Sequence, residues 1–106
     1  MAWSALLLAG LFEILWVLGL KYSQGFTKVW PSVVTLASVP LSFVLLGVSL
    51  QSVPLGTAYA VWTGIGAAGA AVLGILLFGE PASAGRVGCV LLIVMGTLGL
   101  RLVSPD

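Results

Sequence analysis

The sequence predicts an all-α integral membrane protein, with four transmembrane helices in a single domain over residues 1–106. Hydrophobic residues make up 60% of the chain and charged residues 7%, whereas a typical soluble domain has about 25% charged residues. The mean hydropathy is +1.23, and so short a chain has too little interior to hide this much apolar surface from water. The apolar residues also fall into four runs, each long enough to cross a bilayer as a helix.

The predicted helices cover residues 2–20, 29–50, 55–78 and 84–103. Each run is close to the roughly 20 residues that span the hydrocarbon core. The first run is followed by residues 21–28, a polar turn that contains Gly25, and the second by the tight turn of residues 51–54. Gly79 and Pro81 end the third run, because proline cannot continue a helix. Connections this short make consecutive helices antiparallel, which predicts an up-down-up-down bundle.

The composition excludes several classes of function. The chain has no histidine and one cysteine. This excludes an internal disulfide, a His/Cys metal site within one chain, and a Ser-His-Asp or Cys-His catalytic system. Its four basic residues form no run that would neutralise a nucleic-acid backbone. We therefore expect a protein that is not an enzyme and that binds no cofactor, metal or nucleic acid.

The basic residues are unevenly divided between the two sides of the predicted bundle. Lys21, Lys28 and Arg86 lie on the side of the first and third connections, and Arg101 lies on the other side. The positive-inside rule favours a cytoplasmic location for the side with three basic residues. The excess is small, so both orientations remain conceivable.

Glu13 is the one charged residue deep inside a predicted helix. It lies about eleven residues into the first run, or roughly 17 Å, which places it near the bilayer midplane. A carboxylate at this depth is costly, and such residues face a bundle interior or a cavity and mark ion paths. Because desolvation disfavours the charged form, Glu13 is expected to hold either a proton or a cation, as a proton-coupled cation exchanger requires. The alternative is a structural glutamate that stays protonated or pairs with a basic residue, although no basic residue lies near the midplane.

Aromatic and small side chains are predicted to surround this carboxylate. The predicted lining residues are Gly10, Trp16, Ser42, Tyr59 and Trp62. Gly10, Glu13 and Trp16 share one helix face, where Gly10 leaves room and Trp16 supplies a wall and an N–H donor. Ring faces beside a carboxylate suit a cation, and planar guanidinium ions fit best because they stack on rings and pair with carboxylates through two hydrogen bonds. Plain packing is the alternative for Tyr59 and Trp62.

Two further predictions concern the third run and the assembly. Gly64 and Gly66 belong to a stretch of small residues, and clustered glycines can host a bend, so we predict a hinge there. Close helix packing is the alternative. Four helices make a thin bundle that would hardly enclose a cavity with gates on both sides. The sequence therefore predicts a homodimer with two Glu13 carboxylates near a shared site.

Four segments of the chain have a pattern typical of one family, and they cover residues 9–16, 20–27, 30–32 and 54–66. The last segment, Pro-Leu-Gly-Thr-Ala-Tyr-Ala-Val-Trp-Thr-Gly-Ile-Gly, is very specific. Along essentially its whole length the chain resembles the small multidrug resistance family. Trp16 beside Glu13, together with the last segment, is similar to the guanidinium exporters of that family.

The resemblance implies an antiparallel, dual-topology homodimer in the inner membrane of a prokaryote. It implies proton-coupled export of guanidinium and small substituted guanidinium ions by alternating access, with Glu13 binding cation or proton. It also implies that Trp16 and Ser42 orient the glutamate by hydrogen bonds and that Tyr59 and Trp62 line the site. Two other functions remain open: a polyspecific exporter of quaternary ammonium drugs, and a structural membrane subunit without transport.

Overall fold

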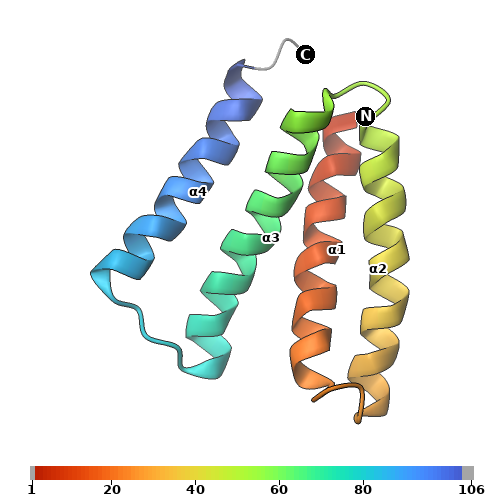
Figure 1. The fold of residues 1–106 in the computed structure, drawn as a ribbon, viewed down its shortest axis with the longest axis vertical. Helices are drawn as coiled ribbons and strands as arrows, with labels where there is room; N and C mark the ends of the chain where they lie inside the picture. Colours follow the sequence, from red (N-terminus) through yellow and green to blue (C-terminus); the bar gives the residue numbers. More distant parts are fainter. Residues whose placement is uncertain (1, 104–106) are drawn as a thin grey trace.

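The computed structural model describes residues 2–103, which form four α-helices (Figure 1). The helices are α1 (Ala2–Tyr22), α2 (Val29–Ser49), α3 (Leu55–Phe78) and α4 (Ala84–Val103). Relative to the predicted runs, α1 extends two residues further and α2 ends one residue earlier. Each helix is long and apolar enough to cross a membrane, with a mean hydropathy of 1.9 to 2.0 over its most apolar part. The prediction of four apolar membrane-spanning helices is confirmed.

The helices lie side by side in the order α2, α1, α3, α4 (Figure 1). Helices that follow one another along the chain run in opposite directions, so the neighbours α1 and α3 run in the same direction. Within residues 2–103, α1 packs against both α2 and α3, and the backbone of α4 lies beside α3 alone. The molecule measures 43 × 35 × 16 Å, so its thickness is little more than the diameter of one helix, about 10–12 Å. The sequence predicted a bundle, whereas the chain forms a nearly flat layer.

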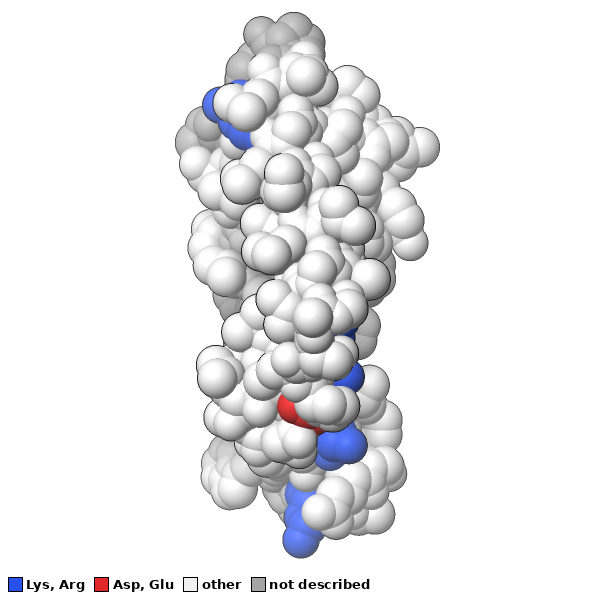
Figure 2. Space-filling view, turned by 90° about the vertical axis from the view of Figure 1, so that its left-hand side faces the viewer, with Lys and Arg blue, Asp and Glu red and all other residues white. Residues whose placement is uncertain are grey.

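Apolar side chains and the hydroxyl-bearing side chains of α2 fill the contact between the first three helices. The buried apolar residues of this core are Leu6, Ala9, Leu46, Val53, Ala58, Val61 and Trp62. The buried face of α2 carries Thr35, Ser38, Ser42 and Ser49, whereas its large residue Phe43 is exposed. Small residues let helices approach closely in lipid, and hydroxyls form hydrogen bonds between them. Figure 2 shows the charged side chains of one face toward the two ends of the molecule, with uncharged surface between them.

The end of α3 fixes the position of Glu80. Gly79 has a φ of 65°, a left-handed conformation that costs glycine nothing sterically. The backbone N–H of Glu80 then donates to the carbonyl oxygen of Gly74 at 3.2 Å. A Cβ on Gly74 would overlap the Glu80 carboxylate, so this carboxylate lies against the bare backbone of α3.

Candidate functional site

Glu13 lies in the middle of α1, partly buried against α3. A Cβ on Gly66 would overlap the carboxyl group of Glu13, so the missing side chain makes space for it. Gly10 does not provide this space, because a Cβ there would lie 2.6 Å from Cγ2 of Ile65. The sequence placed room for the carboxylate at Gly10 on the same helix. The structure places that room at Gly66 on the neighbouring helix, and Gly10 lets Ile65 approach α1.

Two buried polar atoms near Glu13 have no hydrogen-bond partner among the described residues. They are Oε1 of Glu13 and Nε1 of Trp16. A buried polar atom without a partner costs free energy, and nearly all such atoms in folded proteins are paired. One of these atoms accepts a hydrogen bond and the other donates one. Oε1 of Glu13 can therefore bind a proton or accept a hydrogen bond from a cation. Nε1 of Trp16 can donate a hydrogen bond to an acceptor group.

Ser42 connects all three core helices. Its hydroxyl donates to the carbonyl oxygen of Ala9 in α1 at 2.8 Å and accepts from Nε1 of Trp62 in α3 at 3.0 Å. A serine hydroxyl has one proton, and here that proton goes to Ala9. In this conformation Ser42 is thus no donor to Glu13, in contrast to the role that the family resemblance implied. Its bonds instead fix the mutual positions of α1, α2 and α3.

The predicted aromatic residues form a cluster next to Ser42. The ring centroids of Tyr59 and Trp62 lie 5.8 Å apart, and Phe43 of α2 lies 5.2 Å from Trp62 on another side. Trp62 is 5% exposed, whereas Tyr59 is 55% exposed on the surface of the layer. Within residues 2–103 no hydrogen bond joins this cluster to Glu13. The structure brings Ser42, Tyr59 and Trp62 together, whereas the buried polar atoms of Glu13 and Trp16 in α1 form no hydrogen bond with them.

The two glycines predicted as a hinge both make close helix contacts. A Cβ on Gly64 would overlap the hydroxyl of Thr97 in α4, and Gly66 contacts Glu13 as described above. Helix α3 runs without a break through both positions. The close-packing alternative therefore accounts for both glycines in this conformation, and the hinge stays a prediction.

Thr35 was missed by the sequence analysis. It is buried at the α1–α2 contact, where its hydroxyl donates to the carbonyl oxygen of Pro31 at 2.9 Å and reaches that of Trp16 at 3.4 Å. A Cβ on Gly19 would lie 2.6 Å from this hydroxyl. The spacing of the residues could have revealed it, because Thr35, Ser38 and Ser42 follow one another at three- and four-residue intervals and therefore share one helix face.

Replacing Ser42 with alanine (S42A) is expected to destabilise the fold. The substitution leaves the Trp62 N–H and the Ala9 carbonyl without their partner, a loss of about 1–2 kcal/mol for interhelical bonds in a membrane. Ser49 is the matched control, since it is equally buried but its hydroxyl donates within its own helix, to Leu46 at 2.7 Å. Unfolding by SDS in mixed micelles should show a clear loss for S42A and little for S49A. Equal losses would contradict a bridging role for Ser42.

Comparison with known proteins gives a consistent result. The family model described as Small Multidrug Resistance protein matches residues 1–93. A protein named Guanidinium exporter from Yersinia pseudotuberculosis serotype I (strain IP32953) is 53% identical over 104 residues, which are 98% of this chain and 100% of that protein. Proteins of the same name from Citrobacter freundii and Escherichia coli (strain K12) are 53% and 51% identical over 102 residues, each covering 96% of this chain and 97% of the relative.

Proposed function

Because the chain belongs to the small multidrug resistance family, we propose that it exports guanidinium and small substituted guanidinium ions across the membrane. The predicted family is confirmed, and the chain is a multi-pass membrane transporter rather than an enzyme. Relatives at 51–53% identity carry the name Guanidinium exporter, which supports guanidinium as the substrate. Those relatives are bacterial, and the membrane that we propose is the inner membrane of a prokaryotic cell.

The single observation that carries the proposal is the unpartnered Oε1 of Glu13 in the middle of a membrane-spanning helix. An ionisable residue at this depth is expensive and is typically functional. A guanidinium ion supplies parallel N–H donors to a carboxylate, and its flat face stacks on aromatic rings. A quaternary ammonium ion has no N–H to offer this oxygen. The chemistry of the site therefore favours guanidinium over the alternative class of bulky cationic drugs.

We propose that transport is coupled to protons because a proton and guanidinium compete for the Glu13 carboxylate. A Glu13 carboxylate that has taken up a proton no longer attracts a cation, and a bound cation displaces the proton. We propose that guanidinium displaces protons on the cytoplasmic side and that external protons then displace guanidinium. An exchanger of this kind also needs the empty, deprotonated site to reorient rarely. The cost of burying uncompensated carboxylates is a physical reason for it to do so.

The flat layer supports an assembly of two copies. One chain places Glu13 in a sheet of helices that is 16 Å thick, which leaves little depth for a closed compartment. We propose an antiparallel, dual-topology homodimer in which two copies face each other and exchange conformations, so that the site opens to alternate sides. In this dimer Trp16 donates a hydrogen bond to the Glu13 carboxylate and orients it, and the exposed Tyr59 lines the shared site. Ser42 and Trp62 hold the helices around the site, Gly66 leaves space for the Glu13 carboxyl group, and Gly10 leaves space for Ile65. Gly64 and Gly66 bend α3 during exchange.

The proposal is tested with the purified full chain in liposomes that have an acidic lumen. We expect guanidinium to accumulate inside at least about tenfold more than tetraethylammonium, because the outward proton gradient drives its uptake and the site requires N–H donors. Accumulation should vanish when nigericin equalises the pH. Accumulation of tetraethylammonium alone would indicate the polyspecific drug exporter. Uptake of neither ion would indicate a membrane subunit without transport.

A further inference from the structure

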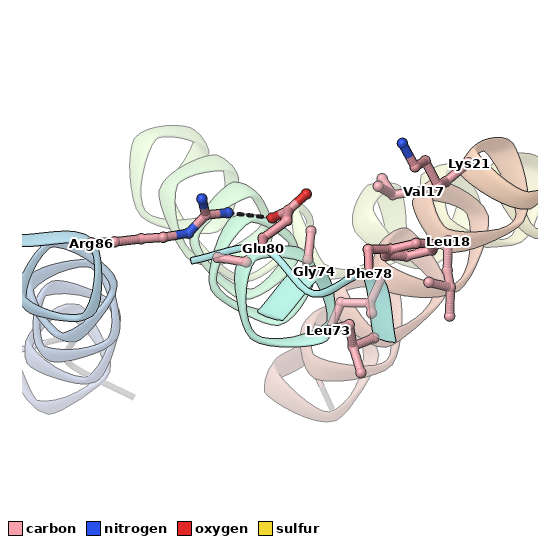
Figure 3. Close-up of a pocket in the computed structure, with 11 residues that line it drawn as sticks. Val17, Leu18, Lys21, Leu73, Gly74, Phe78, Glu80 and Arg86 are labelled. Atoms are coloured by element: carbon pink, nitrogen blue, oxygen red, sulfur yellow. Dashed lines mark hydrogen bonds and ion pairs between the residues drawn. The ribbon is translucent and has the colours of Figure 1, made fainter. Parts of the chain in front are cut away.

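A cavity lies between α1 and α3, and Glu13 is not among the residues that line it (Figure 3). Its volume is about 320 Å³. Apolar side chains of both helices form most of its wall, among them Val17, Leu18, Leu73 and Phe78. Three charged side chains complete the lining, namely Lys21, Glu80 and Arg86. The cavity is thus mainly apolar with a charged rim.

The rim carries an excess of positive charge. Arg86 forms an ion pair with Glu80 through Nη2 and Oε1, and the two charges cancel (Figure 3). Lys21 comes from α1 on the other side of the cavity in this view, and its ammonium group lies 5.5 Å from the ring centroid of Phe78. The Arg86–Glu80 pair is the one salt bridge among residues 2–103, so Lys21 has no acidic partner there. Two basic groups and one acidic group give the rim a net charge of +1.

The charged rim and the apolar wall lie at different depths in the membrane. Lys21 is in the last turn of α1, and Glu80 belongs to the connection between α3 and α4. These positions correspond to the boundary between the lipid headgroups and the hydrocarbon core. The lining also includes Ile14, seven residues before Lys21, so the cavity extends roughly 10 Å along α1 toward the middle of the span. Its shape and polarity match an amphiphile whose head is anionic.

We propose that this cavity binds an anionic phospholipid. The phosphate lies at Lys21 and Arg86, and the upper part of one acyl chain lies between α1 and α3. Basic groups at the ends of membrane-spanning helices attract anionic headgroups, and the apolar wall distinguishes a lipid phosphate from free phosphate. A guanidinium ion does not suit the rim, because the net charge repels it and Glu80 already has a guanidinium partner in Arg86. The inference does not depend on the proposed transport function.

The test measures lipid binding to the full chain by native mass spectrometry, with phosphatidylglycerol and phosphatidylcholine offered at equal concentration. Replacing Lys21 with glutamine (K21Q) should weaken phosphatidylglycerol binding about fivefold, the effect of one basic residue at the membrane surface. Replacing Glu80 with glutamine (E80Q) should strengthen it by a similar factor, because the rim charge rises from +1 to +2 and Arg86 loses its partner. Phosphatidylcholine binding should change in neither variant.

Lys28 provides the matched control. It is a basic and exposed residue in the connection that follows α1, at the same end of the helices as Lys21, but it does not line the cavity. K28Q should bind phosphatidylglycerol like the wild type. K21R keeps the positive charge at position 21 and should also bind like the wild type, which would show that the loss in K21Q is due to the charge. Equal weakening in K21Q and K28Q would show attraction to a general basic surface and overturn the proposal. Weaker binding in E80Q, or displacement of phosphatidylglycerol by guanidinium chloride beyond the effect of sodium chloride, would also overturn it.

Discussion

Replacing Glu13 with glutamine (E13Q) is expected to abolish proton-driven guanidinium accumulation in liposomes and to leave the protein folded. Glutamine has nearly the same shape, but its amide stays neutral and cannot alternate between a protonated and a charged form. The fold should persist, because Oε1 of Glu13 makes no hydrogen bond with any described residue. We expect uptake at the level of protein-free liposomes, together with a wild-type unfolding transition.

The pH dependence of binding gives an independent readout of the same substitution. Guanidinium binding to the wild type should weaken as the pH falls, because protons occupy the carboxylate that the cation needs. Any residual binding to E13Q should not change with pH. The variant E13D, which keeps a carboxylate on a shorter side chain, should retain pH-dependent binding. Normal pH-driven uptake by E13Q would contradict the assignment of Glu13 as the shared proton and cation site.

Replacing Gly66 with alanine (G66A) is expected to reduce transport at least about tenfold. The added Cβ would occupy the space of the Glu13 carboxyl group, so either Glu13 must move or α1 and α3 must separate. Overpacking of a close contact typically costs about 1–3 kcal/mol, and a displaced binding group lowers activity further. The effect should appear in guanidinium uptake and, as a smaller loss, in unfolding by SDS.

Gly47 in α2 is the control for this prediction. A Cβ at that position has no neighbour within 4 Å among the described residues, so alanine fits without strain. G47A should keep wild-type transport and gain up to about 1 kcal/mol, since alanine is a better helix former than glycine. If G66A and G47A transport equally well, Glu13 does not depend on the space at Gly66.

The spans and the central carboxylate were predictable from the sequence because each depends on a local rule. A helix that crosses lipid must be apolar over a fixed length, and a lone charge such as Glu13 is conspicuous in such a run. Neither inference requires knowledge of which helices are neighbours. The same holds for the end of α3 at Gly79, where glycine and a following proline mark the boundary.

What touches Glu13 was not predictable in this way. Gly66 is 53 positions away in the chain, and its contact with Glu13 depends on how α1 and α3 pack. Ser42 stands out in the sequence as a polar residue in mid-span, but its partners Ala9 and Trp62 lie on two other helices. The flat arrangement was also not predictable from the sequence. Short connections determine the directions of successive helices but not the order in which the helices lie side by side.

The distribution of side-chain sizes in α2 has a consequence for sequence variation. Its inner face consists largely of hydroxyl-bearing residues, and its outer face carries larger apolar ones. In a water-soluble protein, large interior residues are the ones that resist replacement. Here the resistant positions are the small ones, because even one extra methyl group separates helices, while the outer positions need only remain soluble in lipid. We therefore expect relatives of this chain to differ mainly by exchanges among the large apolar residues on the outside and to keep the small inner residues.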